Sequence, residues 1–128
     1  MAGPKLDGAG TEKMKTLEDA LTQLHRIHGL VETYALAIKR SQPPGTYLMP
    51  LRRALPMIAS LLKGQFGLIS DQAMALNMVA SRGSNEQVRV RVLREGIGSL
   101  RQAIDVAIVR VKENHAEKEG AGTSNSAG

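Results

Sequence analysis

Apolar residues repeat every seven positions in two long stretches of this chain, one near each end. A second apolar series follows the first by three residues, which is the spacing of helices that pack side by side. This pattern predicts one helix from about residue 13 to residue 40 and another from about residue 84 to residue 115. The two seams comprise Leu17, Ala20, Leu24, Ile27, Val31, Tyr34 and Ile38, then Val90, Leu93, Ile97, Leu100, Ile104, Ala107 and Val111.

Two shorter helices are predicted between the seams. Pro43 ends the first long helix, because proline lacks an N–H and disfavours helical geometry in the residue before it. One short helix should begin between residues 46 and 50, with Thr46 as its cap or Pro50 in its first turn, and end near residue 63. The other should run from about residue 70 to residue 81, capped by Ser70 or Asp71.

The last helix carries both a start signal and two interruptions. Ser84 and Gln87 have the spacing of a capping box, which places the start of the helix at residue 84. Gly96 and Gly98 each cost about 1 kcal/mol inside a helix. They indicate either a bend or a place where the backbone of another helix comes close. Because both lie within one turn, we expect the close approach.

These elements predict an all-α fold, an antiparallel four-helix bundle with two long helices at the ends of the sequence and two shorter ones in the middle. Residues 13–116 should form the bundle domain. The glycine-rich and polar ends, residues 1–12 and 117–128, are expected to be disordered tails. A coiled coil that self-associates through the two seams is the architectural alternative.

The positive charge is concentrated in the later part of the chain. The net charge is +5, but residues 39–112 hold twelve basic residues against four acidic ones. This excess favours an anionic partner, or else it simply solvates the outer faces of the bundle. The chain has no cysteine, no secretory signal and no apolar run long enough to cross a membrane. We therefore expect an intracellular protein, in the cytoplasm or nucleus, without membrane association.

No catalytic constellation stands out, so the chain is predicted not to be an enzyme. His25 and His28 share a helix face but lack a third metal ligand, and neither a metal nor a cofactor is expected. The segment from Arg110 to His115 resembles the Arg-x4-His motif of the HEPN ribonucleases. That resemblance implies an RNA phosphate held by Arg110 and His115 at a dimer cleft, and the match covers six residues.

Methionine and arginine indicate a binding surface. Methionine adapts to irregular partners, and arginine pairs with carboxylates and phosphates. Arg91, Arg94 and Arg101 lie on one side of the last helix, with Arg52 and Arg53 on the second helix and Arg82 and Arg89 nearby in sequence. We therefore predict a non-enzymatic interaction module that docks a short amphipathic or acidic helix of a partner protein. The predicted contacts are Arg52, Arg53, Met57, Phe66, Met74, Met78, Arg91, Arg94 and Arg101.

Two alternatives to this module remain open. The same arginines would let a small nucleic-acid-binding subunit contact a phosphate backbone. A self-assembling helical scaffold would instead use the two seams. The oligomeric state is not predicted.

Overall fold

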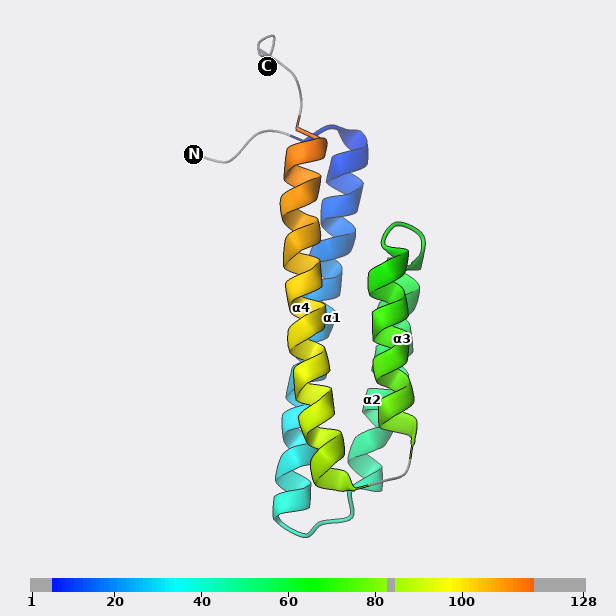
Figure 1. The fold of residues 1–128 in the computed structure, drawn as a ribbon, viewed down its shortest axis with the longest axis vertical. Helices are drawn as coiled ribbons and strands as arrows, with labels where there is room; N and C mark the ends of the chain where they lie inside the picture. The colour runs from blue at the N-terminus through cyan, green and yellow to red at the C-terminus, as the bar shows by residue number, and fades with distance from the viewer. Residues whose placement is uncertain (1–5, 83–84, 117–128) are drawn as a thin grey trace.

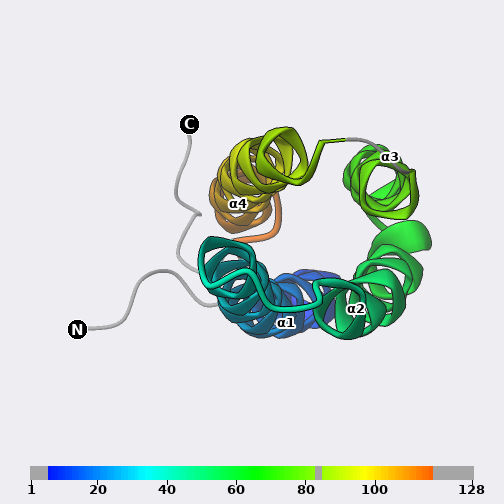
Figure 2. The same ribbon diagram turned by 90° about the horizontal axis from the view of Figure 1, so that it is seen from below.

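Four helices make up most of the computed structural model, which describes residues 6–82 and 85–116. They are α1 (Gly8–Lys39), α2 (Gly45–Lys63), α3 (Gly67–Ser81) and α4 (Glu86–Asn114). The chain runs up and down through the four helices in order (Figure 1). Seen end-on, they stand at the corners of a four-sided bundle in which α1 packs against α2 and α4, and α3 against α2 and α4 (Figure 2). The predicted all-α bundle with long first and last helices is confirmed.

The two apolar seams face the interior of this bundle. Leu17, Ile27, Leu93, Leu100 and Ile104 are completely buried. At the end of the first seam the structure differs from the prediction, because Ala37 is buried in place of the half-buried Ile38. A coiled coil between chains would need exposed seams, so using them inside one chain leaves them no surface for self-association.

The first helix begins five residues earlier than predicted. The carboxylate of Asp7 accepts a hydrogen bond of 2.6 Å from the Gly10 N–H and caps α1 at Gly8. The expected N-terminal tail of residues 1–12 is therefore wrong for residues 8–12, which are helical. Residues 1–5 and the predicted C-terminal tail at 117–128 lie outside the described residues.

At its other end α1 stops before Pro43. The N–H groups of Ser41 and Gln42 donate to the carbonyls of Ile38 and Ala37 at 3.0 and 2.8 Å. This is a Schellman motif, and it places Ser41 in the left-handed conformation with φ of 56°. This position is usually a glycine. Because it is a serine here, only Pro43 predicted the end of the helix.

The predicted caps of the other helices are wrong in detail. Helix α2 follows Pro44 without a side-chain cap, and both Thr46 and Pro50 lie inside it. Helix α3 starts at Gly67, so Ser70 lies inside the helix and is not its cap. The buried hydroxyl of Ser70 instead donates to the Ala59 carbonyl at 2.7 Å and ties α3 to α2.

The N-cap of α4 is Asn85. Its side chain accepts a hydrogen bond of 3.1 Å from the Val88 N–H. Ser84, which the predicted capping box used, lies outside the described residues. The capping chemistry is of the expected kind but is supplied one residue later.

The two glycines of α4 have different surroundings. A Cβ built on Gly96 would clash with the Leu76 side chain of α3, whereas one built on Gly98 would meet nothing within 4 Å. Another helix therefore comes close at Gly96, but through a side chain and not through its backbone as expected, and the expectation is wrong at Gly98.

Helices α1 and α4 extend beyond the α2–α3 hairpin at one end of the bundle. They have 32 and 29 residues, against 19 and 15 for α2 and α3. At 1.5 Å per residue, even the shorter of the long pair exceeds α2 by about 15 Å. Figure 1 shows the α2–α3 turn ending below the start of α1 and the end of α4. A step therefore forms beside α4, and that step holds the first candidate site. None of the helices described is both long and apolar enough to cross a membrane.

Candidate functional site

A groove of about 670 Å³ lies between the α2–α3 turn and the C-terminal half of α4, and we call it the hairpin–α4 groove. Phe66, Leu68 and Ile69 line it from the hairpin. Ala103, Val106 and Ala107 line it from α4, at the i, i+3 and i+4 spacing that places them on one helix face. Because the alanines are small, they leave room beside the turn. Together with Val106 they give the groove an apolar floor.

Large apolar side chains at this groove remain in contact with solvent. Leu68 is 86% exposed, the highest value among the large hydrophobic residues described, and Val106 is 45% exposed. Burying a leucine contributes about 1.5–3 kcal/mol relative to leaving it in water. An occupant that covered Leu68 would therefore gain most of that free energy.

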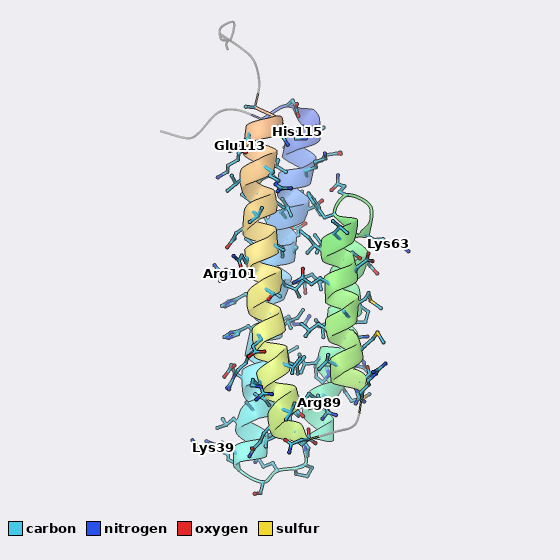
Figure 3. All side chains as sticks on the ribbon, in the orientation of Figure 1. Lys39, Lys63, Arg89, Arg101, Glu113 and His115 are labelled. Atoms are coloured by element: carbon cyan, nitrogen blue, oxygen red, sulfur yellow. The ribbon has the colours of Figure 1, made fainter. Side chains whose placement is uncertain are left out.

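The charged residues that line the groove are all basic. Lys13, Arg110 and His115 lie at its far end, beyond the hairpin turn, and no aspartate or glutamate is among the lining residues. The His115 ring is held between Lys13 Nζ at 3.3 Å and the Asp7 carboxylate at 3.3 Å. Figure 3 shows His115 at the end of the bundle where α4 ends. Asp7 therefore offsets part of the charge at this end, while Arg110 makes no ion pair within the described residues.

A second groove, which we call the α1–α4 groove, lies on the other side of α4 and has a volume of about 870 Å³. Its floor is formed by Leu24 and Ile97, with open space above Gly98. Figure 3 shows Arg101 on the side of α4 that faces away from α3. The residues at its rim are His25, His28, Glu32, Arg94 and Arg101.

Glu32 and Arg94 form a two-pronged ion pair across this groove. The Glu32 oxygens accept hydrogen bonds from Arg94 Nε at 2.8 Å and from its terminal NH2 at 2.6 Å. These bonds lower the pKa of Glu32 and raise the pKa of Arg94, against the opposing effect of partial burial. The same Glu32 oxygen that faces Arg94 Nε lies 3.8 Å from His28 Nε2. Glu32 is therefore shared between an arginine and a histidine.

Arg89 is buried, which corrects the expectation that the later arginines all remain at the surface. Its side chain is 4% exposed and donates to the Tyr34 hydroxyl at 3.0 Å, to Glu86 at 2.5 Å and to the Arg82 carbonyl. Burial lowers the pKa of Arg89, but the Tyr34 hydrogen bond and the Glu86 charge outweigh it, and the net shift is upward. Burial and the Glu86 hydrogen bond also raise the pKa of Tyr34. This cluster fastens the start of α4 to α1.

The nine predicted contact residues do not share one surface. Phe66 lines the hairpin–α4 groove, and Arg94 and Arg101 line the α1–α4 groove. Arg53 and Met57 line a hollow beside Arg26 of α1. The remaining four are spread over three helices: Arg52 donates to the Ala80 carbonyl, Met74 and Met78 are half-exposed on α3, and Arg91 is exposed on α4.

The sequence contained a signal for two lining residues of the hairpin–α4 groove that were absent from the predicted contacts. Val106 is apolar but lies outside the seam of α4, and Leu68 is apolar within a segment predicted to be a turn. Apolar residues at positions that the bundle does not bury are candidates for a binding surface. Lys13 and Arg110 carry no such signal, because basic residues are common throughout this chain.

Comparison of the chain with protein-family models, curated proteins and solved structures gave no match in any of the three. Within residues 6–82 and 85–116, no group of three or more histidines and carboxylates is placed to hold a metal ion. Arg110 and His115 both line the hairpin–α4 groove, and the His115 ring there is engaged by Asp7 and Lys13.

Proposed function

We propose that this chain is a protein-interaction module that docks an acidic amphipathic helix of a partner protein in the hairpin–α4 groove. The observation that supports this function is the 86% exposed Leu68 at the edge of an apolar groove whose charged lining residues are all basic. Apolar side chains of the docked helix would cover Leu68 and Val106, while its acidic side chains would face Lys13 and Arg110. The docking surface differs from the predicted one, but the class of partner is the same.

The dimensions of the groove suit a helix. Its lining residues on α4 run from Ser99 to Asn114, a distance of about 22 Å at 1.5 Å per residue. A helix of about four turns has this length and presents apolar residues at i, i+3, i+4 and i+7. Such a helix would lie beside α4 in the space that the short hairpin leaves open.

Charge favours an acidic partner over a second copy of this chain. The chain has a net charge of +5, so two copies repel each other, and the basic end of the groove has no acidic lining residue for a basic partner to pair with. Complementary charge steers association and suppresses wrong partners more than it adds affinity. The apolar floor should therefore supply most of the binding free energy.

A pair of synthetic peptides tests the proposal. Both peptides carry the same leucine face on a four-turn helix, and their polar faces are glutamate in one and lysine in the other. We expect the acidic peptide to bind, by fluorescence anisotropy, and the basic one to bind far more weakly. Amide chemical-shift changes on adding the acidic peptide should map to residues 65–72 and 99–115.

Leu68→Ser is the decisive variant. Because it removes an exposed side chain, the fold should be unaffected, while the loss of about 1.5–3 kcal/mol of burial should weaken peptide binding roughly 10- to 150-fold. Leu36→Ser is the matched control, since Leu36 is 44% exposed and lies outside the groove. Equal effects of the two substitutions, or shift changes confined to another surface, would refute the proposed function. A concentration-dependent dimer seen by light scattering without peptide would identify a second copy as the occupant instead.

A further inference from the structure

The α1–α4 groove gathers four cation-forming side chains on the side of α4 away from the proposed docking site. His25 and His28 are one turn apart on α1, and Arg94 and Arg101 are two turns apart on α4. Two turns correspond to about 11 Å along a helix. The groove thus has basic groups on both walls and a gap between them above Gly98, where a Cβ would meet no atom within 4 Å.

The Glu32–Arg94 ion pair shows what chemical group Arg94 can hold in this groove. The Glu32 carboxylate lies in the fork of Arg94 at 2.6 and 2.8 Å, the geometry with which guanidinium groups hold carboxylates and phosphates. Arg94 and Glu32 are 50% and 41% exposed, so the pair is open to exchange with an anion from solution. Arg101 has only a loose partner, with its Nε 4.0 Å from Asp105.

We propose that the α1–α4 groove is a binding site for a tetrahedral dianion, of which a phosphate monoester is the biological example, and that this ligand takes the place of Glu32 on Arg94. Arg94 alone is enough to pair with a single carboxylate, as its ion pair with Glu32 shows. A dianion has the charge and the additional oxygens to engage Arg101 and the histidines as well. Glu32 is then an internal competitor that the ligand must displace.

The charged groups that line the groove with His25 and His28 are Glu32, Arg94 and Arg101. His28 Nε2 lies 3.8 Å from the Glu32 oxygen that faces Arg94 Nε, so Glu32 keeps a partner beside it when the ligand takes its place on Arg94.

Sulfate is the first probe, because it is a tetrahedral dianion at neutral and weakly alkaline pH. Titration is followed by the NMR signals of the histidine rings at constant ionic strength. Glu32→Gln should bind sulfate about two- to fivefold more tightly at about pH 8, the factor expected when a surface ion pair no longer competes. Glu12→Gln makes the same charge change outside the groove and should leave the affinity unchanged.

Loss-of-function variants and a second ligand complete the test. Arg94→Ala should weaken sulfate binding more than fivefold and Arg53→Ala should not, with circular dichroism confirming that both fold. Replacing His25 and His28 by asparagine should weaken sulfate binding, because it removes two of the groups that line the groove. Phosphoserine should compete with sulfate for the site, as the phosphate monoester form of the ligand. Equal affinities of Glu32→Gln and Glu12→Gln, or binding of a short DNA duplex without any response to sulfate or phosphoserine, would overturn the proposal.

Discussion

Gly96 and Gly98 offer a direct measurement of how tightly α3 packs on α4. Both lie in the middle of the same helix, so replacing either by alanine gains about 1 kcal/mol of helix propensity. At Gly98 nothing opposes this gain, because an added Cβ meets no atom within 4 Å. Gly98→Ala should therefore raise the free energy of unfolding by up to about 1 kcal/mol.

At Gly96 the added methyl group collides with Leu76. Its distances to Leu76 Cδ2 and Cγ would be 3.0 and 3.2 Å, and Cδ1 would be closer still. Because Cγ is involved, rotation of the terminal methyls alone does not clear the space, and Leu76 is only 6% exposed. Overpacking of this kind costs about 1–3 kcal/mol, which cancels or exceeds the gain in propensity. Gly96→Ala should be neutral or destabilising by up to about 2 kcal/mol.

Urea denaturation followed by circular dichroism gives both values. The two variants should differ by about 1–3 kcal/mol, or at least about 4 °C in melting temperature for a domain of this size. Adding Leu76→Ala to each variant provides a double-mutant cycle, in which the Gly96 substitution should become favourable and the Gly98 substitution should be unaffected. Equal stabilisation by both glycine substitutions would show that α3 does not approach α4 as the structure has it.

Two further predictions concern the cluster at the start of α4. Arg89→Met should lower the free energy of unfolding by about 1.5–3 kcal/mol, because hydrogen bonds to a charged group are lost. In the same urea titration, Arg91→Met at an exposed position should change it by no more than about 0.5 kcal/mol. Equal effects of the two substitutions would contradict the burial of Arg89. In Tyr47→Phe the single remaining tyrosine, Tyr34, should ionise above pH 10 in an ultraviolet titration, because its pKa is raised; the associated stability is present below about pH 10 and is lost as the pH rises through the raised pKa. Ionisation of Tyr34 at or below pH 10 would contradict its burial beside Glu86.

The sequence predicted what depends on periodicity and missed what depends on neighbours. The burial of Leu17, Leu93 and Leu100 follows from a seven-residue repeat that is read along one segment. The start of α3 was placed too late, because Ser70 looked like a cap and its bond to the Ala59 carbonyl depends on another helix. Arg89 looked like its exposed neighbour Arg91, and only the arrival of Tyr34 from α1 makes its burial possible.

The candidate sites were harder to predict for the same reason. Read along the sequence, the arginines of α4 differ little from one another. In the bundle, however, Arg89 is enclosed, Arg94 is paired with Glu32 and Arg110 lies beside an apolar groove. Each of these environments is set by a residue at least 50 positions away or by the length of another element. The composition predicted a positively charged surface. The tertiary structure determines which arginines stay exposed to a partner from solution.

Helix α4 lines two grooves with two series of positions that lie on different faces of the helix. Ala103, Val106 and Arg110 step by three and four residues along the side toward the hairpin, and Arg94, Gly98 and Arg101 do the same along the side toward α1. A rigid helix buried along its seam holds these two faces apart, so a substitution in one groove should leave binding in the other unchanged. The shortness of α2 and α3 is what opens the first groove, and the missing side chain at Gly98 is what opens the second. Filling either space, by a longer hairpin or by a large residue at position 98, should therefore remove one site and spare the other.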